Sequence, residues 1–454
     1  MRALAKARVL LLALVLSQGV ATGWAEEGDA PPASGGEGVW ARGQLLGDPW
    51  GGRSRAAEQG FEIAVAYTAD VLSNVSGGEA RKTGFLGNVD ATLTWDTAPL
   101  MGRDLGSFFL YGLWNHGDRP TDAVGDLQTV DNIEAPDSAK LYEAWWQKAL
   151  LGGDASILLG IYDVNSEFYA IDSAELFVHS SFGTGAELGT SGVNGPSIFP
   201  TAGVGARVKI EPIVGYDFQL AVVEGIPGDP RRPKGTRIDF DSDEGVFLIA
   251  ELGHHRSAAG RPDEGADARR GAYRRRVGRG WAQHPGFLRL SMGSWLYTAR
   301  QPHVSSRDAG GEPIKARGHP GLYVTAEFDA DRLDPLHRQG LSVFSQLGFA
   351  DGDVGPFAGY VGAGIVYTGL LPFRPDDESG FAVAAAFAGD ALRDATRDEG
   401  RRPARAEIAL EWTHRIALTG WLALQGDVQL IVNPGSVRDR PDAWIVGTRW
   451  VVDL

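Results

Sequence analysis

The sequence predicts an all-β protein, a transmembrane antiparallel β-barrel of about 16 strands. Three observations predict it: apolar and polar residues alternate at period two along most of the chain, the alternating segments are long, and short connections alternate with long ones. A mean hydropathy of −0.15 is too polar for a bundle of apolar membrane helices. The sequence contains no cysteine, which excludes disulfides, thiol catalysis and cysteine-ligated metals.

The first 25 residues have the composition of an export signal. Three basic residues precede an uninterrupted apolar run over residues 9–16, and small residues follow up to Ala25. We predict a cleavable signal peptide over 1–25, because this apolar run is shorter than the roughly 20 residues that span a bilayer. The low-complexity sequence behind it predicts an N-terminal periplasmic spacer over 26–45, and the barrel domain then occupies 46–454.

Strict alternation begins at Phe61 and returns in segment after segment to the C-terminus. Phe61, Ile63 and Val65 share one face of the first segment, whereas Glu62 and Ala64 share the other. The segments run about 9 to 14 residues, longer than the usual soluble strand of about 5 or 6, and this length suits a tilted strand that crosses a membrane. The expected strands are 61–72, 87–97, 105–116, 140–151, 154–163, 203–212, 214–224, 245–254, 286–299, 320–331, 339–350, 357–370, 379–391, 404–418, 420–433 and 442–454.

The connections between these segments support an even strand count. With the N-terminus in the periplasm, odd-numbered connections should be long and external and even-numbered ones short. Three tight joins fall at even places: 151–154, 212–213 and 419–420. Three long connections fall at odd places: 117–139, 164–202 and 225–244. The arginine-rich stretch 255–285 is long at an even place, so it is either a periplasmic insertion or a sign that the count slips there.

Several short motifs follow one another in a fixed order from residue 46 onward. They include LGDPWGGR at 46–53, LYEAWW at 141–146 and DVNSEF at 163–168. In this order and spacing they resemble the carbohydrate-selective porins, the OprB-type family of bacterial outer-membrane channels, with its Gly-Asp-Trp-Gly-Gly and Leu-Tyr-Glu-x-Trp motifs. Pro49 inside the first motif and Leu454 in place of a C-terminal Phe depart from the family pattern.

The resemblance implies a sixteen-stranded barrel in the outer membrane that passes small sugars by diffusion, without naming the sugar. It also implies that the loop over 164–202, between the fifth and sixth strands, folds into the lumen as a long constriction loop. The expected partners are sugars and outer-membrane lipid, and monomer and homotrimer both stay open. We expect no cofactor and no metal, and the net charge of −15 disfavours nucleic acid as a partner.

The inward faces of the expected strands carry about twice as many acidic as basic residues. Charged rings set the selectivity of wide pores, so we predict a weak preference for small cations. The alternative is that these charges only keep the lumen wet and pair across strands, since a polar interior is common to porins. The corresponding alternative function is a less selective general diffusion porin for small hydrophilic, weakly cationic solutes.

Sugar selectivity needs an aromatic face on which a pyranose stacks and polar groups that bond its hydroxyls. Glu143 and Trp145 alternate inward on one expected strand, and Arg289 and Trp295 share another. A facing error of one residue would instead turn these side chains to the lipid.

The constriction loop adds Asn165 and Glu167, which we expect to meet Glu143 and Trp145 and so control sugar passage jointly with them. The complete set of residues expected to line the pore is Glu143, Trp145, Asn165, Glu167, Arg207, Arg289 and Trp295.

Two other classes of protein compete with a channel. An envelope enzyme lacks support, because the sequence carries no His-Glu-x-x-His, Gly-x-Ser-x-Gly or phosphate-loop motif, and the adjacent His254 and His255 point to opposite strand faces. A lipase would need a serine–histidine pair on the lipid face, where His414 is the only hint. A secreted lectin or β-sandwich explains the alternation but not sixteen long strands in one chain.

Overall fold

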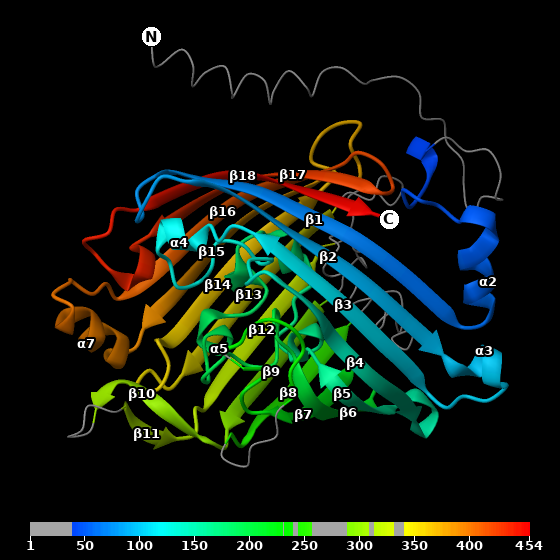
Figure 1. The fold of residues 1–454 in the computed structure, drawn as a ribbon, viewed down its shortest axis with the longest axis horizontal. Helices are drawn as coiled ribbons and strands as arrows, with labels where there is room; N and C mark the ends of the chain where they lie inside the picture. The colour runs from blue at the N-terminus through cyan, green and yellow to red at the C-terminus, as the bar shows by residue number, and fades with distance from the viewer. Residues whose placement is uncertain (1–38, 230, 239–243, 257–287, 308–312, 331–339) are drawn as a thin grey trace, which may run out of the picture. The chain divides into compact units, whose positions relative to one another are not determined.

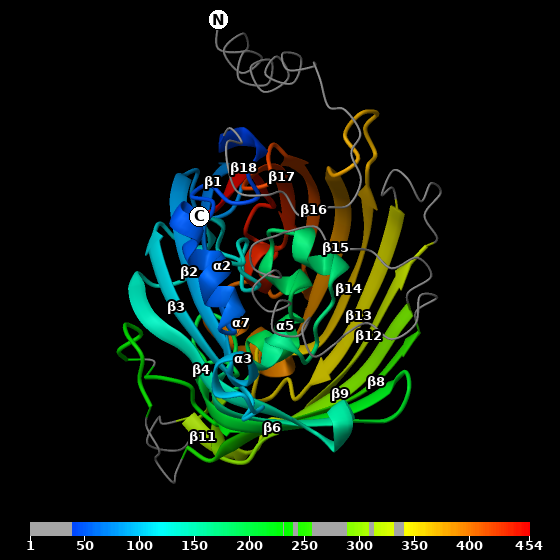
Figure 2. The ribbon, with the colours of Figure 1, turned by 90° about the vertical axis from the view of Figure 1, so that its right-hand side faces the viewer.

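The computed structural model describes residues 39–229, 231–238, 244–256, 288–307, 313–330 and 340–454. Within these residues, sixteen strands form one closed antiparallel barrel (Figures 1 and 2). Successive barrel strands pair with one another, and β1 (Phe61–Ser76) closes the ring against β18 (Ala443–Asp453). Closure leaves no unpaired strand edge, which is what a β-structure needs in a hydrocarbon environment.

The barrel confirms the predicted fold class, and its strands coincide with the sixteen expected segments to within a few residues. The other barrel strands are β2 (Thr83–Asp96), β3 (Ser107–Gly117), β4 (Ser138–Leu150), β5 (Ala155–Tyr162), β6 (Gly203–Ile213), β7 (Tyr216–Glu224), β8 (Val246–Arg256), β9 (Leu288–Tyr297), β12 (Gly321–Asp329), β13 (Gly340–Ala350), β14 (Phe357–Thr368), β15 (Glu378–Ala388), β16 (Ala406–Ala417) and β17 (Leu422–Val432).

The described connections contain elements that the alternation did not predict. A two-stranded hairpin, β10 (Arg300–Arg307) with β11 (Pro313–Arg317), stands apart from the barrel sheet between β9 and β12. The helices are α2 (Gly52–Glu58), α3 (Thr97–Met101), α4 (Thr121–Val124), α5 (Ala186–Gly189) and α7 (Asp390–Asp398), and single 3₁₀ turns lie at Val39–Ala41, Pro49–Gly51, Leu151–Gly153, Val164–Ser166, Ser173–Leu176, Ser180–Phe182 and Pro434–Ser436.

The two ends of the barrel differ in their connections. We call the end with the tight joins after β4, β6 and β16 the short-turn end, and the opposite end the long-loop end. Arg256 at the end of β8 pairs with Leu288 at the start of β9, so the arginine-rich connection begins and ends at the short-turn end. The strand count therefore does not slip there; residues 257–287 themselves lie outside the described residues.

Burial alternates along the strands as the sequence pattern predicts. In β1, Thr68 and Asp70 are buried on the inner face, whereas Ile63 and Val71 are exposed on the outer face. The same order returns in β18, where Arg449 is buried on the inner face next to the exposed Trp450. The barrel thus presents an apolar outer wall and a polar inner one, the distribution of a membrane-spanning barrel.

The segment before β1 is tied to the C-terminus of the chain. The backbone N–H of Leu45 donates to the Asp453 carbonyl at 2.8 Å, and Arg53 Nη2 donates to the Leu454 carbonyl at 2.7 Å. The N–H of Leu454 in turn donates to the Val65 carbonyl at 2.9 Å. These bonds join the segment before β1, and β1 itself, to the last residues of the chain at the seam where the barrel closes.

The predicted signal peptide over 1–25 and most of the spacer over 26–45 lie outside the described residues and stay predictions. In the part of the chain that is described, no helix is both long and apolar enough to cross a membrane.

Candidate functional site

Two long connections turn back into the barrel. They are residues 118–137, between β3 and β4, and 163–202, between β5 and β6, which we call the first and second inward loops. Figure 2 shows α5, a part of the second inward loop, inside the ring of strands. The loop therefore takes the course that the family resemblance implied for it.

A loop that enters the barrel loses water, so its backbone N–H groups need other acceptors. Glu407 on β16 supplies them to the first inward loop: its carboxylate accepts the N–H groups of Leu127 and Gln128, each at 3.0 Å. The same carboxylate accepts the N–H of Gly435 from the connection after β17. One buried wall residue thus holds two connections.

Other wall carboxylates hold the second inward loop in the same way. Glu411, four residues beyond Glu407 on the same face of β16, accepts the N–H groups of Val178 at 2.7 Å and His179 at 2.9 Å. Glu327 on β12 accepts the N–H of Ser173 at 2.6 Å. Wall amides complete the set by donating to loop carbonyls: Gln346 to Phe182, Gln425 to Leu176 and Gln429 to Val130.

The two inward loops also bond to each other. The N–H of Asn132 donates to the Val178 carbonyl at 2.8 Å, and the N–H of Ser180 donates to the Thr129 carbonyl at 3.1 Å. The loops are therefore one connected structure inside the barrel, braced from several sides of the wall.

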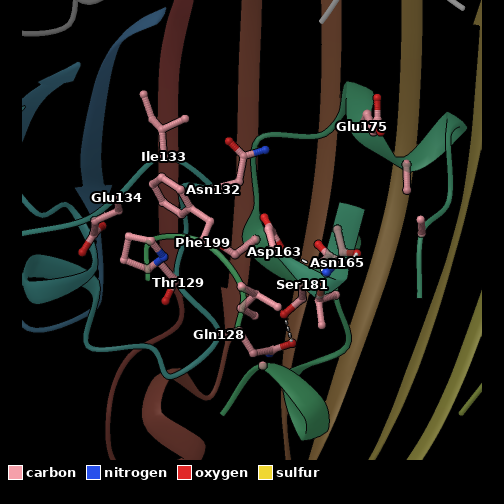
Figure 3. A pocket seen from close by; sticks show the side chains of 18 of the residues that line it. Gln128, Thr129, Asn132, Ile133, Glu134, Asp163, Asn165, Glu175, Ser181 and Phe199 are labelled. Atoms are coloured by element: carbon pink, nitrogen blue, oxygen red, sulfur yellow. Dashed lines mark hydrogen bonds between the residues drawn. The ribbon is translucent and has the colours of Figure 1, made fainter. Parts of the chain in front are cut away.

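A cavity of about 330 Å³ lies between the two loops and the wall (Figure 3). Side chains of the first loop, such as Gln128 and Asn132, face Asp163 and Asn165 of the second across it. Ser181 Oγ donates to Gln128 Oε1 at 3.0 Å along its edge. The charged residues on the cavity are Glu134, Glu143, Asp163, Glu175, Arg415 and Arg449.

Arg449 on β18 fixes the first inward loop by its charge. Its guanidinium contacts Asp70 Oδ2 at 2.7 Å on the neighbouring strand and Asp131 Oδ1 at 3.0 Å on the loop, and it donates to Asn132 Oδ1 at 2.8 Å. Arg449 thus neutralises Asp70, an inward-facing acidic residue of the kind that gave the predicted acidic excess of the lumen.

Glu143 and Trp145 both face the lumen, and the structure brings them together. Trp145 Nε1 donates to Glu143 Oε2 at 3.2 Å, and the Trp145 ring stacks on Phe109 with centroids 4.8 Å apart. Glu143 also accepts the N–H of Asp163 at 3.2 Å and lines the cavity. Trp145 lies behind it, 8% exposed, and orients the carboxylate.

Asn165 and Glu167 separate within the second inward loop. Asn165 lines the cavity, with its Nδ2 donating to the Phe168 carbonyl at 3.1 Å. The Glu167 carboxylate turns to Arg207 on β6, with Nε and Nη2 of the guanidinium each 2.7 Å from a carboxylate oxygen. Burial by itself would raise the pKa of Glu167, but Arg207 holds that pKa below its usual value. Arg207 is 1% exposed, so its end of the ion pair is buried at the barrel wall.

Arg289 and Trp295 face inward on β9 and are not among the residues that line the cavity. Arg289 Nη2 lies 3.6 Å from Glu251 Oε1, whose other oxygen accepts the N–H of Tyr169 at 2.9 Å. Trp295 packs beside Tyr323, and Tyr323 stacks on Tyr169 with centroids 4.1 Å apart. These two predicted residues therefore support the second inward loop at Tyr169.

The sequence reasoning missed the first inward loop and the cavity residues it brings, among them Glu134. The unusual length of 117–139 was the signal for it, but no motif there indicated an inward course. It also missed Phe199, a half-buried aromatic residue on the cavity, and Glu175.

The structure also gives His414 a serine partner. Ser379 Oγ lies 2.8 Å from His414 Nδ1, because the two residues are direct cross-strand neighbours on β15 and β16. Asp377 Oδ2 is 3.9 Å from His414 Nε2, but it is engaged by Arg374 at 2.8 Å. These are polar contacts at the short-turn end of the outer wall.

Comparisons with known proteins agree with this geometry. Residues 80–454 match the model of a family described as "Carbohydrate-selective porin, OprB family". The chain is 23% identical to Porin B of Pseudomonas aeruginosa over 436 residues, which cover 89% of this chain and 90% of that protein. Its fold is similar to the high-pH structure of Pseudomonas putida OprB, with a TM-score of 0.76, 18% identity and coverage of 92% of this chain and 100% of that one. The low-pH structure of the same protein aligns with a TM-score of 0.56 and 14% identity.

We predict that Glu411→Gln loosens the second inward loop. The amide keeps one acceptor oxygen but turns an NH₂ group toward a backbone N–H, so at least one charge-assisted bond worth about 1.5–3 kcal/mol is lost. Single-channel recording should show larger conductance and more open-channel noise than in the parent protein. Glu399→Gln, at an exposed position after α7, is the matched control and should leave both unchanged; equal traces for the two variants would contradict the prediction.

The Glu167–Arg207 pair should behave as a coupled unit. Glu167→Gln leaves a buried guanidinium uncompensated, so the barrel should lose about 3–5 kcal/mol of stability by urea titration in lipid. Adding Arg207→Gln to that variant should restore part of the loss, because the uncompensated charge is then gone. A double variant as unstable as the sum of the two single variants would show that the pair is not coupled.

The burial of Glu187 on α5 predicts that docking of the second inward loop depends on pH. Its Oε1 accepts the Tyr169 hydroxyl at 3.0 Å and it faces Tyr360, and burial raises its pKa from 4.5 to about 7. The docked loop retains the Glu187 proton that a solvated loop loses, so docking weakens as pH rises from 4.5 through 7, by roughly 3 kcal/mol in all. Open-channel noise should therefore increase between pH 5 and pH 8, and Glu187→Gln should abolish the increase. Persistence of the full pH effect in that variant would assign it to another group.

Proposed function

Since the chain belongs to the carbohydrate-selective porin, OprB family, we propose that sugars cross through the cavity between the two inward loops and that groups on those loops set the selectivity. The protein is a carbohydrate-selective porin of the outer membrane, a channel and not an enzyme. The path and the residues along it are the part that we propose.

One observation carries this proposal: amide and carboxylate side chains from two braced loops line opposite walls of the cavity, and bonds within the protein hold them in place. Asn132 and Gln128 stand on one side, and Asp163 and Asn165 on the other. A sugar hydroxyl both donates and accepts, so such a lining replaces its hydration shell at small cost. Binding that is compensated but not deep lets a permeant enter and still leave, which passive diffusion requires.

The aromatic contact that we assign to the sugar is Phe199. Its ring is half-buried on the cavity, whereas Trp145 is covered by Glu143 and Phe109. A pyranose face stacks on an aromatic ring for about 0.5–1.5 kcal/mol beyond its buried area. Trp145 then acts on the permeant through Glu143, whose carboxylate it orients.

Glu134, Glu143, Asp163 and Glu175 on the cavity outnumber Arg415 and Arg449. This lining supports the weak cation preference that we predict for small ions, and with it the alternative of a less selective pore for weakly cationic solutes. Sugar block of the ion current separates the two, since a general pore passes sugars without binding them.

We predict that Phe199→Ala weakens sugar block about fivefold, the equivalent of roughly 1 kcal/mol of lost stacking. The measurement is ion current across a planar bilayer with maltose, glucose and a neutral polyol as blockers. Trp145→Ala should weaken block by a smaller factor, because it removes only the partner of Glu143.

Phe349→Ala removes an equally large ring from the exposed outer wall and should leave block unchanged. Equal block in all three variants and the parent would move the sugar path away from this cavity. Closure of the current in thirds during the same recordings would indicate a homotrimer, and closure in one step a monomer.

A further inference from the structure

The amide side chains that the first inward loop brings to the cavity direct their donors at the protein. Gln128 Nε2 donates to the carbonyl oxygen of Glu407 at 3.2 Å and to its carboxylate at 3.1 Å. Asn132 Nδ2 donates to the Phe177 carbonyl at 3.0 Å. These NH₂ groups hold the loop in place, so they are poorly placed to donate to a permeant as well.

Two further amides on the cavity have the same orientation, and in both the oxygen is left over. Asn165 Nδ2 donates to the carbonyls of Phe168 at 3.1 Å and Gly183 at 3.4 Å, and Gln425 Nε2 donates to the Leu176 carbonyl at 2.6 Å. Among the described residues, no donor bonds to Asn165 Oδ1 or Gln425 Oε1. Both residues line the cavity, so each offers it an acceptor.

The carboxylates on the cavity add acceptors and negative charge. An ionised carboxylate accepts hydrogen bonds and donates none. Glu143 accepts from Trp145 Nε1 and from the N–H of Asp163, both at 3.2 Å, and these uncharged donors do not cancel its charge. The acidic side chains that line the cavity, several of them visible in Figure 3, are Glu134, Glu143, Asp163 and Glu175.

The guanidinium groups on the cavity are already compensated by protein carboxylates. Arg449 lies 2.7 Å from Asp70 Oδ2 and 3.0 Å from Asp131 Oδ1, and Arg415 forms an ion pair with Glu378. Arg415 and Arg449 are the basic residues among the described residues that line the cavity. An anionic permeant would therefore have to compete with buried carboxylates for its counter-charge.

We propose that the cavity recognises sugars as hydrogen-bond donors and ranks them by charge, with hexosamines before neutral hexoses and hexuronates last. This inference rests on the sugar path proposed above. The ammonium group of a hexosamine brings three donors and a positive charge, whereas the carboxylate of a hexuronate brings only acceptors and a negative charge. All three classes share the pyranose ring, so stacking on Phe199 does not distinguish them.

Block of the ion current across a planar bilayer tests the ranking, with glucosamine, glucose and glucuronate as the probes. At pH 6 the amine is protonated and the uronate ionised, and about 0.1 M KCl keeps the screening of charges moderate. Glucosamine should reach half-block at a concentration about threefold or more below that of glucose, and glucuronate should need at least about tenfold more than glucose.

Glu175→Gln removes one negative charge from a half-buried position on the cavity. The variant should lower the preference for glucosamine over glucose by about half, and it should change the block by glucose itself less than about twofold. Glu399→Gln, at an exposed position after α7, is the matched control and should keep the preference of the parent protein. Heat-modifiable migration on a detergent gel confirms that each variant is a closed barrel before it is compared.

Glucuronate that blocks as well as glucose would overturn the inference, and so would a glucosamine preference that Glu175→Gln leaves unchanged. In either case, a glucose block that Phe199→Ala still weakens would leave the proposed sugar path standing. Absence of glucose block in the parent protein would instead overturn the path, and the ranking with it.

Discussion

The capture of loop backbone by carboxylates of the inner wall is the interaction on which the channel depends. Glu407, Glu411 and Glu327 each accept backbone N–H groups of an inward loop, and Glu251 accepts that of Tyr169. Ordering a loop costs roughly 1–2 kcal/mol per residue in backbone entropy, and burying its amides unpaired would cost more. Charge-assisted bonds from several sides offset both costs, so the loops stay inside the barrel and narrow it.

This capture changes what the acidic composition means. The alternation correctly identifies the wall carboxylates as inward-facing. A carboxylate whose oxygens accept backbone N–H groups, however, attracts a passing ion less than a solvated carboxylate does. Asp70 is likewise engaged by Arg449, and Glu167 by Arg207. On the path that we propose, the field on a permeant comes from the few charges that line the cavity, a smaller set than the inward charges of the whole barrel.

The bonds that hold the inward loops in place also bear on how a porin can select a permeant without binding it too tightly to release it. Because the inward loops bond to the wall and to each other, the cavity through which we propose that sugars pass is held in shape by the protein itself. Preorganisation lowers the cost of ordering on binding, so modest contacts suffice for recognition. Modest contacts also break quickly, and a permeant must leave its binding site before transport is complete.

The sequence by itself determined the barrel. Period-two alternation over long segments fixes which residues face lipid, and register follows from it because a slip of one residue would turn a whole strand over. The same pattern placed Glu143 and Trp145 correctly on the inner face. Only the tertiary structure decided which inward residues meet: that Glu143 joins Trp145 and Asp163, whereas Glu167 turns to Arg207, depends on the path of a loop through the lumen. Loops have no period, and the carboxylates that hold them lie between 82 residues (Tyr169 to Glu251) and 280 residues (Leu127 to Glu407) away in the chain. No local pattern records contacts of that range.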